Sequence, residues 1–135
     1  MRVVVDTNVL ISAALKAESS PRYALRWVER QGILLKSEAT EEELRRTIAK
    51  PRLFRLLRDT EYLDHLMAML AAAELVQTSS TIEACSDSDD DKFLELAVDG
   101  KAEVIVSGDA ALLQLSPFCG IPIIPPTVFV RGKMP

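Results

Sequence analysis

The chain has 135 residues, 48% of them hydrophobic, and its 16 Lys and Arg against 20 Asp and Glu give a net charge of −4. This length suits a single domain over residues 1–135 with an ordinary buried core. The negative net charge argues against a protein that binds nucleic acid over its whole surface, but it is compatible with a local basic patch. Because Asp6 and Asn8 interrupt the opening apolar run, we expect a cytoplasmic protein without a membrane partner.

The first third of the chain predicts a buried strand followed by two helices. Val3–Val5 is a run of β-branched residues without polar alternation, which is typical of a strand buried on both faces in a parallel sheet. A helix over Val9–Leu15 follows. The second helix is predicted to begin at Pro21, with Ser20 as its cap, and to stop at Gly32.

The middle third is predicted to be mostly helical. A short apolar run, Ile33–Leu35, indicates the second strand. Thr40 and Glu43 have the spacing of a capping box, which predicts that the next helix begins at Thr40. Further helical pieces are expected over Leu53–Leu57 and from Thr60 onward, followed by a brief strand at residues 75–76.

The last third returns to alternating helices and strands. We expect a helix from near Ser88 or Asp89 to Gly100, a buried strand over Val104–Val106 and a short helix over Ala110–Leu115. Residues 121–124 contain a proline, which favours a final strand at the sheet edge. Strands that alternate with helical crossovers predict an α/β fold with a parallel sheet covered on both faces.

Four acids are expected to meet at one edge of this sheet. Asp6 and Asp109 each follow a buried strand, and ligands bind at the carboxyl ends of the strands in such sheets. Asp90 shares a helical face with apolar residues 93, 94 and 97, so it is predicted to point inward, whereas Asp91 does not share that face. Glu43 lies early in a helix that follows a strand, which places it at the same edge.

Converging carboxylates repel one another unless a cation lies between them. Mg²⁺ or Mn²⁺ suits such oxygen ligands, and Thr7, Asn8 and Ser107 are candidates to orient ligands or water around the ion. Each acid also has a purely local explanation. Asp6 is a turn residue, Glu43 the acid of a capping box and Asp109 a helix N-cap.

Other kinds of site are less compatible with the sequence. Asp87, Asp89 and Asp91 have calcium-loop spacing, but Lys92 and Val98 stand where that loop needs glycine and glutamate. The GxxxxGK[ST], GxGxxG and GxSxG motifs are absent. The one histidine, His65, is interpreted as structural, and Cys85 and Cys119 are interpreted as reduced core thiols.

A basic segment begins directly after Glu43. Residues 44–58 contain no acid and carry six cations: Arg45, Arg46, Lys50, Arg52, Arg55 and Arg58. A solvated helix face is the ordinary interpretation of such a run. Phosphate contacts beside a metal site are, however, what a nuclease requires, so Arg45, Arg46, Lys50, Arg52 and Arg55 are candidates to bind nucleic acid.

Four motifs in order then resemble the PIN domain family, most closely its bacterial and archaeal VapC-related toxins. They are Val4–Val9 around Asp6, Ser37 to Leu44, Asp87–Ala97, and Val106 to Asp109 with Leu112 and Leu113. Many relatives carry an arginine where this chain has Ser86.

The resemblance implies a three-layer α/β/α sandwich and a Mg²⁺- or Mn²⁺-dependent ribonuclease that hydrolyses RNA phosphodiester bonds. It also implies that Asp6, Glu43, Asp90 and Asp109 form the catalytic, metal-binding cluster. An antitoxin protein and a homodimer are the partners that it implies. The alternative function is a protein-binding module that keeps the fold with little or no nuclease activity.

Overall fold

The computed structural model describes residues 1–133 and contains a parallel sheet with the strand order β3-β2-β1-β4-β5. The domain expected over 1–135 includes residues 134–135, which lie outside the described residues. The strands are β1 (Arg2–Val5), β2 (Ile33–Lys36), β3 (Glu74–Leu75), β4 (Val104–Val106) and β5 (Ile123–Ile124).

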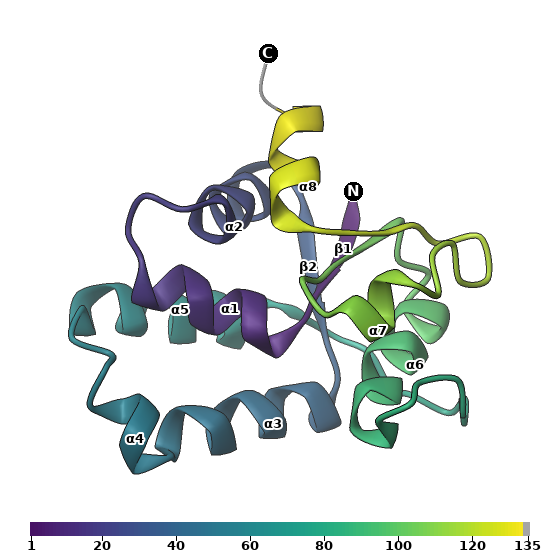
Figure 1. Cartoon of the computed structure of the whole chain (residues 1–135), viewed down its shortest axis with the longest axis horizontal. Helices are drawn as coiled ribbons and strands as arrows, with labels where there is room; N and C mark the ends of the chain where they lie inside the picture. Colours follow the sequence, from purple (N-terminus) through teal and green to yellow (C-terminus); the bar gives the residue numbers. More distant parts are fainter. Residues whose placement is uncertain (134–135) are drawn as a thin grey trace.

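Helices cover both faces of this sheet (Figure 1). They are α1 (Thr7–Leu15), α2 (Ser20–Gln31), α3 (Glu38–Ala49), α4 (Pro51–Phe54), α5 (Thr60–Ala72), α6 (Asp91–Asp99), α7 (Ala110–Leu113) and α8 (Pro126–Lys133), with a 3₁₀ turn, η1 (Ser88–Asp90), before α6. None of the helices in the described part of the chain combines the length and the apolar character needed to span a lipid bilayer.

The side chains of β1 divide the core into two halves. Val3 and Val5 pack with residues of α1, α2, α5 and α8. Val4 points to the other face and packs with residues of α6 and α7. Because successive side chains of a strand point to opposite faces, a valine run without polar alternation fits a strand covered on both sides. The predicted three-layer α/β/α sandwich is therefore confirmed.

The topology creates a switch point between β1 and β4. The chain runs outward from β1 through β2 to β3, and then returns to place β4 on the other side of β1. Val5 is in register with Val106, and the Asp6 N–H donates to the Val106 carbonyl at 3.1 Å. In open α/β sheets ligands bind at such a point, beyond the carboxyl ends of the strands.

Helix α1 begins at Thr7, two residues before the expected Val9, because Asp6 caps it. The predicted starts of α2 and α3 were also wrong, by one and two residues. The cap of α2 is Ser19 instead of Ser20, since the Ser19 hydroxyl accepts from the Arg22 N–H. Helix α3 begins at Glu38, because Ser37 and Thr40 form the capping box that we assigned to Thr40 and Glu43. These errors arose because several neighbouring side chains are good caps and only the backbone path decides among them.

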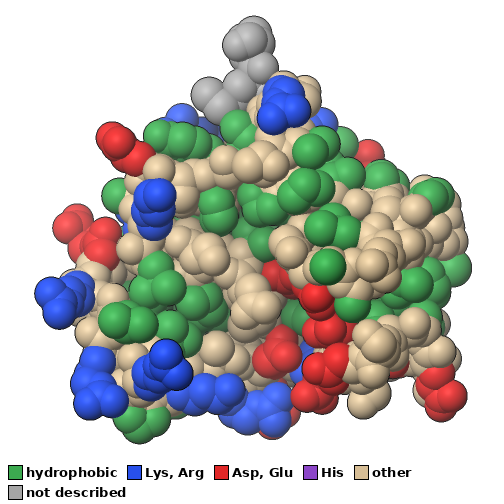
Figure 2. Space-filling model, in the orientation of Figure 1, with side chains coloured by type: hydrophobic (Ala, Val, Ile, Leu, Met, Phe, Trp, Pro, Cys, Tyr) green, Lys and Arg blue, Asp and Glu red, His purple; other side chains and the backbone are tan. Residues whose placement is uncertain are grey.

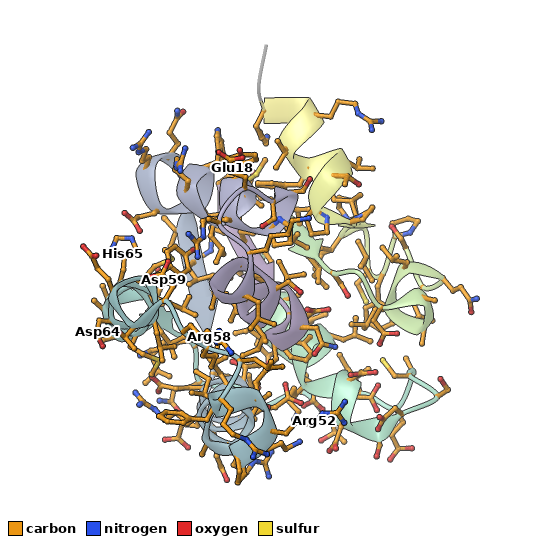
Figure 3. All side chains as sticks on the ribbon, turned by 60° about the vertical axis from the view of Figure 1, so that its left-hand side comes forward. Glu18, Arg52, Arg58, Asp59, Asp64 and His65 are labelled. Atoms are coloured by element: carbon orange, nitrogen blue, oxygen red, sulfur yellow. The ribbon has the colours of Figure 1, made fainter. Side chains whose placement is uncertain are left out.

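Smaller differences concern the ends of the chain and its surface. Helices α4 and α7 end at Phe54 and Leu113, earlier than expected, and α8 was not predicted. His65, interpreted as structural, is exposed and contacts Glu29 of α2 at the surface. Figure 3 shows it projecting outward from α5. Cys85 and Cys119 are both free, as expected, but Cys119 is exposed and Cys85 only partly buried.

Candidate acidic active site

A pocket of about 200 Å³ lies at the switch point, beyond the carboxyl ends of β1 and β4. All four acids predicted from the sequence line it. In Figure 2 acidic side chains gather in the same region, between α3 and the α6–α7 side. The complete lining is Asp6, Thr7, Asn8, Glu43, Thr47, Lys50, Asp90, Phe93 and Asp109.

Asp6 is the most deeply buried of these acids, with 3% of its surface exposed. One carboxylate oxygen caps α1 by accepting from the Val9 N–H at 2.9 Å, and the other accepts from the Ser107 hydroxyl. Burial raises the pKa of Asp6, the two hydrogen bonds act to lower it, and the charges of Asp109 and Glu43 raise it further. Asp6 therefore both caps α1 and lines the pocket.

Asp90 and Asp109 form the other half of the cluster. Asp109 caps α7 by accepting from the Ala111 N–H at 3.1 Å, so its local explanation also holds. Asp90 closes η1 just ahead of α6. Burial, followed by the hydrogen bond and charge of Asp109, raises the pKa of Asp90 to about 7. A carboxyl group whose ionisation is opposed by burial and by a neighbouring acid, as that of Asp90 is, marks a position where a cation would be stabilised.

Glu43 reaches the pocket from α3. One of its oxygens accepts from the Thr7 hydroxyl and the other lies 3.2 Å from the Lys92 ammonium group. Its explanation as a capping-box acid is wrong, since Ser37 and Thr40 cap this helix. Sequence reasoning missed Lys92, although a lysine that directly follows an acidic run was a usable signal.

Ser107 connects the two strand ends. It is fully buried, it donates to Asp6, and its oxygen accepts from the Asp109 N–H at 3.0 Å. Thr7 and Asn8 line the pocket, as do Thr47 and Phe93, which were not predicted. The predicted supporting residues therefore lie beside the acids that they were expected to orient.

Asp91 is buried, but it does not line the acidic pocket. It accepts from the backbone N–H groups of Ala84 and Cys85 at 3.1 and 2.8 Å. Burial acts to raise the pKa of Asp91, but these hydrogen bonds outweigh it and lower the pKa. Asp91 thus fastens the loop that precedes η1, and so helps to fix the place of Asp90.

The basic segment lies along α3 and α4, next to the acids (Figure 2). Of the predicted RNA-binding residues, Lys50 lines the acidic pocket, and Arg45 pairs with Glu41 at 3.4 Å. Arg46, Arg52 and Arg55 are exposed and, within residues 1–133, form no ion pair with a carboxylate. Figure 3 shows Arg52 and Arg58 at the surface of this region.

The chemistry of the pocket suits a hard divalent cation. Its acidic donors are four carboxylates, and Mg²⁺ and Mn²⁺ prefer oxygen ligands of this kind. Within residues 1–133, however, no three His, Cys, Asp or Glu side chains are arranged closely enough to hold a metal ion. The donor types fit such an ion, while the side chains would have to move together to bind it.

The protein is thus a parallel α/β sandwich with a cluster of acids at the switch point of its sheet. The family model described as "PIN domain" matches residues 2–111, a range that includes all four acids. The chain therefore belongs to the PIN domain family. PIN domains are generally nucleases, and those nucleases generally use divalent metals.

Several individual proteins are also similar to this chain, each with less than 30% sequence identity. An uncharacterized protein of Methanocaldococcus jannaschii, MJ1680, is 29% identical over 117 residues, which cover 85% of this chain and 75% of that protein. Two solved structures share the fold. PAE2754 from Pyrobaculum aerophilum has a TM-score of 0.65 and 19% identity, and covers 100% of this chain and 91% of its own. VapBC2 from Rickettsia felis, bound to a DNA fragment from their promoter, has a TM-score of 0.60 and 13% identity, with coverage of 91% and 97%.

Proposed function

We propose that this protein is a Mg²⁺- or Mn²⁺-dependent endoribonuclease. One observation carries the proposal: four carboxylates from separate parts of the chain line one pocket at the switch point of the sheet. Carboxylates at such a place are suited to binding a metal, and the exposed cations beside them are suited to binding phosphates. Membership of the PIN family raises the expectation of nuclease activity.

The roles of the residues follow from their contacts. Asp6, Asp90 and Asp109 would hold the ion, with Glu43 as a further ligand or as a group that positions water. When bound, Mg²⁺ or Mn²⁺ would stabilise charge on the phosphoryl oxygens and lower the pKa of the attacking water. Ser107 fixes the orientation of Asp6, as Thr7 does for Glu43.

The cations would position the RNA. Lys50 lies in the pocket itself, where it can contact the phosphate that is cleaved. Arg46 lies on α3, Arg52 on α4 and Arg55 directly after α4, where they can contact neighbouring phosphates. Hydrolysis forms a new P–O bond from water and breaks the P–O ester bond, and the leaving oxygen takes up a proton.

We further propose that the protein is the toxin of a toxin–antitoxin pair. The support is its fold, which is similar to that of VapBC2 from Rickettsia felis. An antitoxin protein and a second copy of this chain are then the expected partners. Co-expression with the product of the neighbouring reading frame, followed by size-exclusion chromatography, tests both; a monomer that binds no such product contradicts the toxin assignment.

The ribonuclease proposal is tested with single-stranded RNA, with Mn²⁺ or Mg²⁺ and with EDTA. Cleavage should require the ion and should be lost in Asp90→Asn. Asp89→Asn is the matched control, because Asp89 is the exposed neighbour and does not line the pocket. Cleavage that persists in EDTA, or that Asp90→Asn retains in full, contradicts the proposal.

A protein-binding module is the second candidate function. One observation favours it: the acids of the described residues do not form a preassembled metal site, and Lys92 already neutralises Glu43. Thermal melting with increasing Mn²⁺ separates the candidates, since an ion that binds the folded state raises the melting temperature. A melting temperature unaffected by Mn²⁺ or Mg²⁺, together with absent cleavage, would favour the module.

A further inference from the structure

A second depression, of about 480 Å³, opens beside the acidic pocket. We call it the neutral groove; its lining includes Asn8, Ser12, Pro21, Asp109, Pro126 and Thr127. Asn8 and Asp109 line the acidic pocket as well. The two depressions therefore join, and anything bound at the acids can extend into the groove.

The groove differs from the acidic pocket in its chemistry. Apart from Asp109, the described residues that line it carry no charge. Its walls combine proline and valine surface with the hydroxyls of Ser12, Ser20 and Thr127. Figure 2 shows neutral surface between α1, α7 and α8, next to the acidic cluster. An apolar cavity with a few hydrogen-bonding groups suits an uncharged, flat ligand better than a phosphate group.

Contacts between helices hold the walls of the groove in place. The Arg22 guanidinium donates from Nε to the Ala13 carbonyl at 2.8 Å, which ties α2 to α1. It also packs over the Tyr62 ring at 3.6 Å, which ties α2 to α5. Trp27 and Phe129 meet edge to face at 5.4 Å, which ties α2 to α8. The groove is therefore formed before any ligand binds.

We propose that the neutral groove receives the base and ribose of one nucleotide next to the cleaved phosphate. This inference rests on the proposed ribonuclease function and requires the nucleotide in the groove to be unpaired. A base in a duplex is stacked and paired, so it cannot enter a side groove unless it first leaves the stack. The order of chemistries supports this arrangement: cations along α3 and α4, then the acids, then an uncharged groove.

Filling the groove tests the inference. Thr127→Trp and Ser12→Trp place a large side chain there from two different helices, and both replaced residues are exposed. Gly132→Trp is the matched control, because its added Cβ meets no atom within 4 Å and Gly132 does not line the groove. All four proteins are given a single-stranded RNA pool of random sequence, and the cut sites are sequenced. Thermal melting verifies that each variant is folded.

We expect the wild type and Gly132→Trp to favour particular bases at one position beside the cut. Both groove variants should lose this preference. Their kcat/KM should also fall at least about tenfold, which is a usual effect of altered pocket contacts. The same RNA annealed into a duplex should be cut at least about tenfold more slowly by the wild type.

The outcomes separate the inference from the function beneath it. If the wild type cuts RNA and both folded groove variants keep its base preference, the groove inference is wrong and the ribonuclease proposal stands. Equal cutting of duplex and single strand leads to the same conclusion. Loss of a protein partner by variants with unchanged base preference would assign the groove to that partner instead. Absence of cleavage by the wild type with any divalent ion would overturn both proposals.

Discussion

The acidic pocket and the basic segment lie side by side, yet they are built in opposite ways. The acids come from four separate parts of the chain, at residues 6, 43, 90 and 109; the first is buried and the other three are partly buried. The cations come from one continuous stretch, residues 45–58, and most of them are exposed. Focused charge thus depends on the fold, whereas a charged surface needs only local sequence.

Among the changes considered, removal of the most buried acid should reduce RNA cleavage the most. Asp6→Asn keeps the size of the side chain but removes a metal ligand, so we expect cleavage to fall by about 10³-fold or more. Asp64→Asn, an exposed change on α5, should leave cleavage unchanged. Initial rates on a labelled single-stranded RNA with saturating Mn²⁺ provide the measurement, and near-normal rates for Asp6→Asn would show that the pocket is not catalytic.

Weakening the basic segment should affect binding more than chemistry. Arg52→Ala combined with Arg55→Ala should weaken RNA binding by about tenfold and make it less salt-dependent, because fewer phosphates are neutralised. Arg26→Ala with Arg30→Ala removes the same charge from the exposed side of α2 and serves as the control. Binding isotherms at several salt concentrations decide the matter; equal losses in both pairs would mean that net charge alone matters.

The raised pKa of Asp90 predicts how stability depends on pH without metal. Its pKa is about 7 in the folded protein against an ordinary 3.8, so the folded state binds the extra proton between these values. The free energy of unfolding should therefore fall as pH rises from about 4 to 7. Allowing for solvent screening, we expect a contribution of about 1–2 kcal/mol.

The variant Asp90→Asn, melted in the presence of EDTA, tests this dependence on pH. It should melt roughly 3–8 °C above the wild type at pH 8, with a smaller difference at pH 5, where the wild-type carboxyl is already protonated. Added Mn²⁺ should remove the advantage, because the ion stabilises only the wild type. A difference that does not change with pH would mean that repulsion among the acids is not its source.

The smallest effect is expected from Lys92, the cation that already lies among the acids. Lys92→Met frees Glu43 from its ammonium partner at 3.2 Å. Without metal the variant should be slightly less stable, and its affinity for Mn²⁺ should rise about two- to fivefold as the competing charge disappears. Isothermal titration with Mn²⁺ measures this; a weaker affinity would show that Lys92 supports the site instead of competing for it.

Most of the fold, and the acids themselves, could be predicted from local pattern. A valine run that ends in Asp6, and the run of residues 104–106 followed by Asp109, indicate buried strands with acids at their ends. The apolar face predicted for Asp90 agrees with its place in the pocket, but Asp91, which does not share that face, is the more deeply buried of the two. The exact caps of α2 and α3 could not be predicted, since adjacent serines and threonines cap equally well. Helix α8 was not predicted either, because its stability depends on packing against α2.

The sequence by itself determined which segments become strands and that each of two buried strands ends in a carboxylate, because side-chain size and polarity act locally. Only the tertiary structure decided that Glu43 meets Thr7 and Lys92, that Asp91 fastens a loop, and that an uncharged groove adjoins the acids. The reason is physical: these contacts join residues from different helices and loops. Their distances depend on how the layers pack, and no short stretch of sequence encodes that packing.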